Sequence, residues 1–544
     1  MAPYTRPMKK FRSAPFVLGF ISLTVLFSRL PRLAWSAEPP APRISRITID
    51  GSSIFDLNRQ ITLRHFPYTW INVLHIQTKE QIIRQELLLK EGDPVDEFLI
   101  HETERNLRAL SFIRSAQIEQ LPQTDGTVAL MVHVGDSWTT EPQINTSGIN
   151  KIDTVEVGFK EKNFLGYGKS VGVFYQKGVD SIQREYRYFD PRFLGSRWQL
   201  TGNYISRTGG LEKFAEINRP FFSADTRFSA RTSYNQIVQP VDVFQNNVKV
   251  SQFEQTKDIN ESYIGTKVGG GRSWVAHEGI RYKYESQHFA ATDKTNGAIP
   301  IPEKFKTLFS DLDISRTRFI VLTRVEKMTR VEDINLGPQF SLSPGYSPKQ
   351  FTGTRDSSEF ESTYGQSFLI NQMHLATTRF EMKGRNIFTQ PENERYLASA
   401  QYYDRRYHFQ TMTAKTRLEW GQHLDSDNQI TLGGNNGLRA FAVNDFSGNK
   451  SFLFNAEDRI FIVDEAFELF AIGAAVFYDA GSVWSEGQTM CLSDIHSDVG
   501  AGLRLGLTRS SSEVIVRLDF SYRLQRSPAN SDKFIITFGT SQAF

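Results

Sequence analysis

The stretch GGNNGLRAF at residues 433–441, with FYDAGSVW at residues 477–484 downstream of it, decides how the rest of the chain is interpreted. The glycine-rich turn delivers Arg439 next to an aromatic residue, and Asp479 lies in a run that alternates like a strand of a membrane barrel. An arginine folded into a barrel needs a carboxylate partner, so Asp479 is the first candidate. An ordinary solvated arginine in an outer loop is the alternative.

A second candidate carboxylate lies near the end of the chain, in VIVRLDFSY at residues 514–522. Successive side chains of a strand point to opposite faces, so Asp519 shares a face with Arg517 and lies opposite Phe520. In a membrane barrel the polar face lines the lumen. The pattern therefore predicts a lumenal Asp519, within reach of charge-assisted hydrogen bonds from an arginine on an inward-folded loop.

Composition limits the classes of protein that fit the chain. It has 544 residues, of which 12% are aromatic, and a formal net charge of +3. Lysine and arginine are interleaved with aspartate and glutamate, which argues against a nucleic-acid-binding surface. The single cysteine, Cys491, excludes an intrachain disulfide and a cysteine-based zinc cluster.

Residues 1–36 have the features of a secretory signal. A basic start precedes an apolar core at residues 14–27, and Ala34-Trp35-Ser36 fits a cleavage site. A retained membrane anchor is the alternative, although the core is shorter than the roughly 20 residues that span a bilayer. A proline-rich linker at residues 37–42 follows. Beyond it no run of about 18 apolar residues occurs, so a membrane-spanning form would have to be a closed sheet.

Residues 43–136 are expected to form one small α+β domain in the order strand, helix, helix, strand, strand. The segments that alternate as strands are residues 43–51, 113–120 and 127–134. Two helices with apolar stripes lie between the first and second strands, and Thr78 and Asp93 are predicted to cap their N-termini.

Five features of this domain follow one known pattern: Gly51 after the first strand, Gly92-Asp93 after the first helix, Asn106-Leu107 in the second helix, Phe112, and the turn Asp125-Gly126. With them the domain resembles a polypeptide-transport-associated (POTRA) domain. The resemblance implies a sheet edge to which an extended client polypeptide adds as a strand. The candidate edge residues are Ile113, Ser115, Gln117 and Glu119.

An insertion at about residues 53–77 departs from the POTRA pattern. We expect its aromatic residues, Phe66 and Trp70, to pack rather than to form a binding groove. Its histidines, His65 and His75, lack nearby carboxylates in the sequence, so no metal site is predicted.

Residues 137–544 are a succession of amphipathic segments about ten residues long, such as residues 198–204 and 414–420. Alternation alone would also fit a water-soluble sandwich. The export signal, the segment length, aromatic residues near segment ends and charges on the inward faces favour an outer-membrane barrel. The length predicts on the order of 16 antiparallel strands, with 12 strands and long loops as the alternative.

The last segment, residues 534–544, alternates and ends in phenylalanine. It resembles the C-terminal sorting signal of outer-membrane barrels, carried here by Phe534, Ile536, Phe538 and Phe544.

The inward-loop stretch has a counterpart in one family. Leu438-Arg439-Ala440-Phe441, followed by Phe477, Asp479 and Gly481, is similar to the lumenal-loop motifs of the BamA/TamA-type outer-membrane superfamily, also called the bacterial surface antigen family. Ala440 replaces the usual glycine. The resemblance implies that Arg439 and Phe441 hold the loop in the lumen, with Asp479 as partner of the arginine and Asp519 as a further inward carboxylate.

The chain is therefore expected to be mostly β, with a transmembrane barrel in the bacterial outer membrane and a POTRA-like domain in the periplasm. The expected function is insertion or translocation of polypeptide clients, in contact with outer-membrane lipid, with periplasmic or lipoprotein partners and without nucleic acid. A two-partner secretion pore for one exoprotein and a passive porin or structural barrel are the alternatives. The sequence has no nucleophile elbow or metal-binding helix motif, so neither enzyme activity nor a cofactor or metal is expected.

Overall fold

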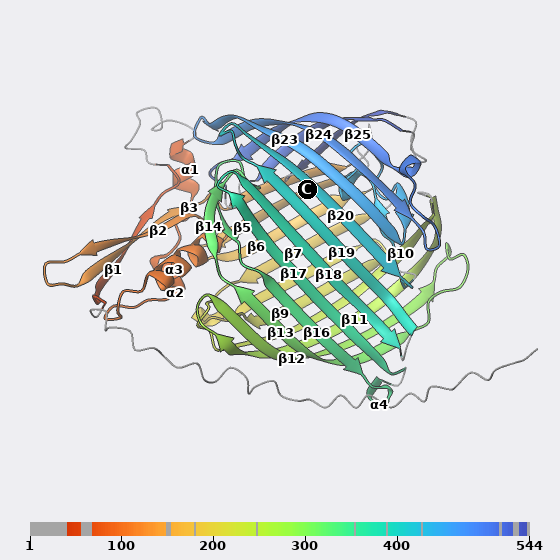
Figure 1. Cartoon of the computed structure of the whole chain (residues 1–544), viewed down its shortest axis with the longest axis horizontal. Coiled ribbons are helices and arrows are strands. Elements are labelled where there is room, and N and C mark those ends of the chain that lie inside the picture. The colour runs from red at the N-terminus through yellow and green to blue at the C-terminus, as the bar shows by residue number, and fades with distance from the viewer. Residues whose placement is uncertain are drawn as a thin grey trace, which may run out of the picture.

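The computed structural model describes residues 41–540 except 56–67, 148–153, 179–180, 246–247, 353–354, 388–389, 426–427, 511–513 and 526–531. The predicted signal segment and most of the linker, as well as His65, Phe66 and Phe544, lie outside the described residues. A small α+β domain lies against one end of a closed β-barrel (Figure 1).

The small domain consists of β1 (Ile44–Ser52), α1 (Tyr68–Leu74), α2 (Glu80–Glu86), α3 (Glu97–Ala109), β2 (Ile113–Pro122) and β3 (Val128–Asp136). Its sheet has the order β1-β3-β2, with β1 parallel and β2 antiparallel to the central β3. Apolar residues on one face of this sheet and on α2 and α3 form a single core. β2 is therefore an edge strand, as the client-edge hypothesis requires.

Both predicted helix caps are wrong. The residue before α2 is Lys79, which makes no side-chain cap, and Thr78 instead accepts a hydrogen bond from Asn163 Nδ2 at 2.9 Å. α3 is capped by Asp96, whose carboxylate accepts from two backbone N–H groups of the first turn. Asp93 instead accepts from the backbone N–H of Lys90 at 2.9 Å, so it closes the turn before the helix.

The insertion contributes the short helix α1. Phe55 and Tyr68 meet edge to face with their ring centroids 5.1 Å apart, whereas Trp70 is 60% exposed. The expected packing role therefore does not hold for Trp70. His75 Nε2 lies 3.1 Å from Asp136, a carboxylate that the sequence did not place near it.

Twenty strands among the described residues form the closed barrel. They are β4 (Thr140–Ser147), β5 (Thr154–Phe164), β6 (Lys169–Lys177), β7 (Ile182–Asp190), β8 (Gln199–Arg207), β9 (Gly210–Arg219), β10 (Phe228–Gln245), β11 (Val248–Gly270), β12 (Trp274–Ala291), β13 (Glu303–Arg316), β16 (Gln339–Ser347), β17 (Ser357–Asn371), β18 (His374–Ile387), β19 (Gln390–Asp404), β20 (Gln410–Gln422), β23 (Lys450–Ala466), β24 (Phe470–Trp484), β25 (His496–Leu507), β26 (Ile515–Arg523) and β27 (Phe534–Thr540). Sequential neighbours pair antiparallel, and β27 closes the barrel beside β4.

The expected count of about 16 strands is thus too low. That count assumed about 10 residues per strand, joined by short turns and by longer loops. Many connections are in fact very short, and β11, with 23 residues, runs far beyond a membrane-spanning length, so less of the chain lies in loops.

Apolar and polar side chains of the barrel strands point to opposite faces, as expected for a membrane-spanning sheet. Ile264, Ile280 and Val476 are 62%, 57% and 55% exposed on the protein surface, where lipid would cover them. On the other face, Arg281 pairs with Asp311 at 3.1 Å and with Glu361 at 2.7 Å. The inward ion pairs fill the lumen with polar groups.

Two connections form small sheets of their own. Between β13 and β16 the chain makes a hairpin of β14 (Phe319–Thr323) and β15 (Val331–Asn335). Between β20 and β23 it makes β21 (Ile430–Leu432) and β22 (Phe446–Gly448), which flank the 433–441 stretch. The one-turn helix α4 (Lys349–Thr352) lies between β16 and β17.

If the small domain lies in the periplasm, the end of the barrel that it contacts is the periplasmic end. Several turns at this end contact the domain: Lys79 N donates to Gly166 O at 3.0 Å, and Asn106 Nδ2 donates to Phe222 O at 3.0 Å. The β14–β15 hairpin belongs to this end, and the 433–441 loop enters from the other. In the described part of the chain, no helix is long and apolar enough to cross a bilayer.

Candidate functional site in the barrel lumen

The loop that carries Arg439 is shaped by glycines. Gly433 and Gly437 have φ values of 157° and 113°, and a Cβ on Gly437 would lie 2.3 Å from Leu453 of β23. Asn455 of the same strand donates a hydrogen bond to Gly437 O at 2.7 Å. A side chain at residue 437 would therefore push the loop away from the wall on which it rests.

An apolar cluster anchors the loop on both sides of the arginine. Leu438, Ala440 and Phe441 are at most 1% exposed and pack with three other buried residues, Leu432, Leu453 and Ile535. Ile535 belongs to the last strand, β27, so the loop reaches the closing strand of the barrel. Ala440 fits where the family has glycine, because its φ is not in the left-handed region, unlike that of Gly437.

Arg439 is 3% exposed and lies between two carboxylates. It binds Asp479 of β24 with two nitrogens, at 2.7 and 3.0 Å, and Glu457 of β23 through Nη1 at 2.7 Å. Its guanidinium also lies 3.4 Å from the ring centroid of Phe477. The planar fork of arginine, which lysine lacks, makes this combination of a bidentate pair and a stacked ring.

Asp519 lies in the same cluster but is not the principal partner of Arg439. Its carboxylate is 3.9 Å from Arg439 Nη1, whereas Arg504 Nη1 is 2.6 Å away and Arg517 Nη1 is 3.1 Å away. The expected inward position of Asp519 is seen. Its main contacts are with arginines of the neighbouring wall.

Glu457 joins the loop arginine to the wall arginines. It lies 2.7 Å from Arg439, 3.1 Å from Arg459 and 3.3 Å from Arg504, and its side chain is fully buried. Glu457 is not among the residues that the sequence patterns singled out. The parity argument used for Asp519 would have placed it inward, because five of the six residues at even positions from 452 to 462 of β23 are apolar.

Asp498 completes a row of four buried carboxylates on four consecutive strands, β23 to β26. It lies directly opposite Asp479 in the β24–β25 register and accepts a hydrogen bond from Ala440 N at 3.2 Å. The four carboxylates and their arginines form a charge network that fastens the loop to this part of the wall. Buried pairs of this kind give a defined geometry, and losing one partner is costly.

The other predicted site residues lie elsewhere. Ser115, Gln117 and Glu119 are exposed on the edge strand β2, but Ile113 is fully buried in the domain core. Ile113 therefore cannot present its side chain to a client. Phe534, Ile536 and Phe538 are 50%, 45% and 38% exposed on the outer face of β27.

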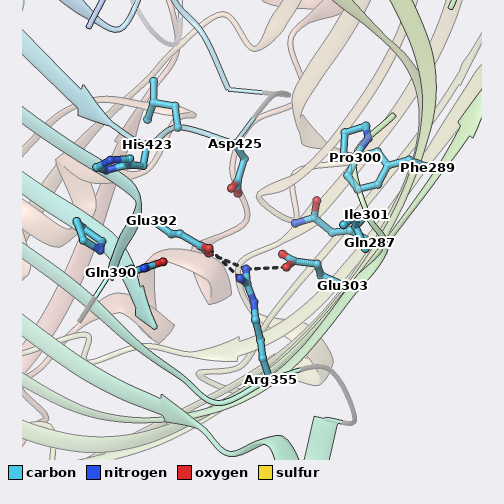
Figure 2. A pocket seen from close by; sticks show the side chains of 12 residues that line it. Gln287, Phe289, Pro300, Ile301, Glu303, Arg355, Gln390, Glu392, His423 and Asp425 are labelled. Carbon is cyan, nitrogen blue, oxygen red and sulfur yellow. Dashed lines mark hydrogen bonds and ion pairs between the residues drawn. The ribbon is translucent and has the colours of Figure 1, made fainter. Parts of the chain in front are cut away.

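A cavity of about 730 Å³ lies at the barrel end opposite the small domain, and Figure 2 shows its lining. Arg355 is held there between Glu392 and Glu303, each at 2.6 Å. Its walls are charged and open, which fits the mouth of a polar lumen rather than an apolar ligand pocket. No group of three or more His, Cys, Asp or Glu side chains in the described chain is arranged to hold a metal ion.

A barrel of amphipathic strands, a small α+β domain at one mouth and a loop fixed in the lumen by a buried arginine define a class: outer-membrane barrels with a periplasmic domain. Residues 163–544 match the Omp85 superfamily domain, and the chain belongs to this superfamily. It is a bacterial outer-membrane β-barrel protein.

One relative and two solved structures illustrate the similarity. A putative outer membrane protein assembly factor of Treponema pallidum (strain Nichols) is 29% identical over 126 residues, which are 22% of this chain and 15% of the relative. CdiB from Escherichia coli is 12% identical, with a TM-score of 0.46, over 94% of this chain and 92% of that one. BamA from Haemophilus ducreyi lacking POTRA domains 1-3 is 12% identical, with a TM-score of 0.37, over 92% and 84%.

Proposed function

We propose that this protein inserts polypeptide clients into the outer membrane or moves them across it, without covalent chemistry. The observation that carries the proposal is the buried network around Arg439. It fixes an inward loop against β23 to β27, the strands beside the barrel closure. A passive pore needs no such brace on one part of its wall.

The closure between β4 and β27 is where we place the opening of the barrel. The described parts of these strands have 8 and 7 residues, whereas those of β10 and β11 on the other side have 18 and 23. A seam with fewer paired residues has fewer inter-strand hydrogen bonds to break when it opens. An opened seam offers two strand edges to which a client strand can add while the loop braces the adjoining wall.

The small domain would receive the client first. In the described chain no strand pairs with the outer edge of β2, and the exposed Ser115, Gln117 and Glu119 lie along it. Side chains of α3 bind two backbone groups of β2: Arg108 donates to Ala116 O at 2.9 Å, and Ile118 N donates to Glu104 at 2.8 Å. A client strand would have to displace them. A client that adds there as a strand is held by backbone hydrogen bonds, which tolerate many sequences. Clients of varied sequence need this kind of recognition.

The test is capture of clients in living cells. A photoreactive residue is placed at Gln117 or at Glu119, with one at Asp125 in the β2–β3 turn as the matched control. We expect trapped precursors of barrel proteins from Gln117 and Glu119 and few from Asp125. One dominant secreted protein would instead indicate a dedicated secretion pore, and an empty catch in cells with a normal outer membrane would favour a passive barrel.

A further inference from the structure

The hairpin between β13 and β16 crosses the periplasmic mouth of the barrel. This mouth hairpin, residues 317–338, leaves the wall at β13, and Met328 near its tip packs with buried residues of β23, β24 and β26. In the order of strands around the barrel, β26 is almost opposite β13. Figure 1 shows β14 between the small domain and the barrel.

The barrel side of the mouth hairpin is firmly packed. Val325 and Leu336 are 3% and 7% exposed in a cluster with Leu375 and Tyr403 of the wall. Backbone carbonyls of the hairpin accept hydrogen bonds from Thr411 at 2.9 Å and from Arg459 at 2.8 Å. Buried apolar contacts and satisfied backbone groups make the hairpin part of the barrel.

The opposite side of the mouth hairpin holds the small domain through polar contacts. Arg108 of α3 forms a bidentate pair with Asp333, at 2.8 and 2.7 Å. Arg330 donates to the carbonyls of Ile113 and Arg114 in β2, at 2.7 and 3.2 Å. The guanidinium of Arg105 lies 4.5 Å from the ring centroid of Phe319.

This second interface is loosely packed. Cavities of about 560 and 230 Å³ lie between the domain and the barrel, and Arg108 lines both. Burial first, and then the like charges of Arg509 and Arg330, lower the pKa of Arg114 to about 10. A polar interface with voids and crowded cations separates more readily than the apolar one on the barrel side.

The contacts of Arg330 coincide with the edge assigned to clients. A strand that adds to β2 needs its backbone carbonyls as acceptors, and Arg330 already uses two of them at the start of the strand. Client binding at this part of the edge and docking on the hairpin therefore compete.

We propose that the mouth hairpin is an autoinhibitory latch: it holds the small domain across the periplasmic mouth through Asp333 and Arg330, and a client strand releases the domain by taking over the β2 edge. The second half of this inference rests on the proposed function. The first half does not, because docking on the hairpin needs no client.

Two ion pairs connect the latch to the lumenal loop. Arg459, which holds the backbone of the hairpin, binds Glu457 at 3.1 Å, and Glu457 binds Arg439 at 2.7 Å. Movement of the hairpin would therefore disturb the partner of the loop arginine.

The test places changes on the hairpin only, so that the small domain keeps its own contacts. In the full chain with Cys491→Ser, spin labels at Asp125→Cys and Arg406→Cys report the distance between the domain and the barrel without client. Asp333→Ala with Arg330→Ala is expected to broaden a narrow distance distribution. Asp333→Glu alone, which keeps the carboxylate, and Glu80→Ala, which removes an exposed ion pair with Arg84 within α2, are expected to leave it narrow.

Client capture is the second readout. In the Asp333→Ala, Arg330→Ala variant, photocrosslinking from Gln117 is expected to rise on the order of tenfold, the ratio for losing about 1.4 kcal/mol of competing interaction. Unchanged distances would overturn the latch. Broadened distances with unchanged capture, in a protein whose wild type captures clients, would overturn the competition. If the wild type captures nothing, the proposed function fails while the distances still decide whether the latch exists.

Discussion

At the residue scale, the buried charges around Arg439 decide how the loop is held. Strand parity predicted from sequence that Asp479 and Asp519 face inward, and it could not rank them as partners. Which carboxylate is nearer to Arg439 depends on how far the loop reaches across the barrel wall. That distance is determined only in the folded barrel. The structure places Asp479 and Glu457 within 2.7 Å of Arg439 and Asp519 at 3.9 Å.

Replacing Arg439 is expected to release the loop. Arg439→Ala leaves Glu457 and Asp479 buried without their shared cation, a loss of about 3 to 5 kcal/mol. Arg439→Lys keeps the charge without the fork and should be intermediate. Protease cleavage within residues 433–441 measures the release, with Arg231→Ala, a lumenal arginine on β10, as the control. Equal protection of the loop in Arg439→Ala and in wild type would contradict the assignment.

Glu457 and Asp519 are expected to differ in the same assay. Glu457→Gln weakens the hold on Arg439, Arg459 and Arg504 together, so the loop should become cleavable. Asp519→Asn mainly affects Arg504 and Arg517, so the loop should stay protected even if the barrel is less stable. The reverse order of sensitivity would mean that Asp519 holds the loop.

His133 is expected to make the small domain pH-dependent. Hydrogen bonds to Asp50, and then to Glu119, raise the pKa of His133, and they join all three strands of the sheet. A raised pKa in the folded state means that this contribution to stability is complete below about pH 6.5 and is lost as the pH rises through the folded-state pKa. NMR titration should give a pKa above 6.5 that Asp50→Asn lowers, and a pKa unaffected by Asp50→Asn would refute the contact.

At the element scale, the inward loop depends on a few backbone positions. Gly437→Ala places a methyl group against Leu453 in a left-handed conformation, which costs about 1 to 3 kcal/mol. Ala440→Gly should change little, because residue 440 has no left-handed backbone. Protease cleavage of the loop should therefore appear in Gly437→Ala and not in Ala440→Gly. Equal behaviour would show that the turn is set elsewhere.

Sequence patterns predicted whether each element is a strand or a helix better than they predicted the residues at which it begins and ends. The order of strands and helices in the small domain is seen, apart from the additional α1 in the insertion. The first cap failed because Thr78 contacts the barrel residue Asn163, a tertiary contact with no local signal. The mouth hairpin was counted as ordinary barrel sequence, because its alternation is that of a strand whether it lies in the wall or across the mouth.

At the scale of the whole molecule, the barrel has more strands than the sequence suggested. Dividing the length of residues 137–544 by the combined length of a typical strand and its connection predicted about 16 strands. The described barrel has twenty, because the lengths of the connections leave no periodic signal in the sequence. The seam between β4 and β27 is the proposed place of opening. Nothing in the composition marks this seam, because it follows from which strands become neighbours.

A covalent lock on the seam should stop client insertion. In a Cys491→Ser background, one cysteine in β4 and one in β27, chosen by scanning for the pair that oxidises, would fix the two strands. Client assembly is expected to fall when the pair is oxidised and to recover on reduction, while the barrel stays folded throughout. Normal assembly by the oxidised protein would rule out exit through this seam.

Reconstitution of the purified chain in lipid vesicles with an unfolded barrel-protein precursor tests polypeptide insertion without other cell components. The fraction of precursor that becomes a folded, heat-modifiable barrel is followed with time. Folding is expected to be faster with the wild-type chain than with Arg439→Ala or with protein-free vesicles. Equal rates in all three would contradict a role in polypeptide insertion.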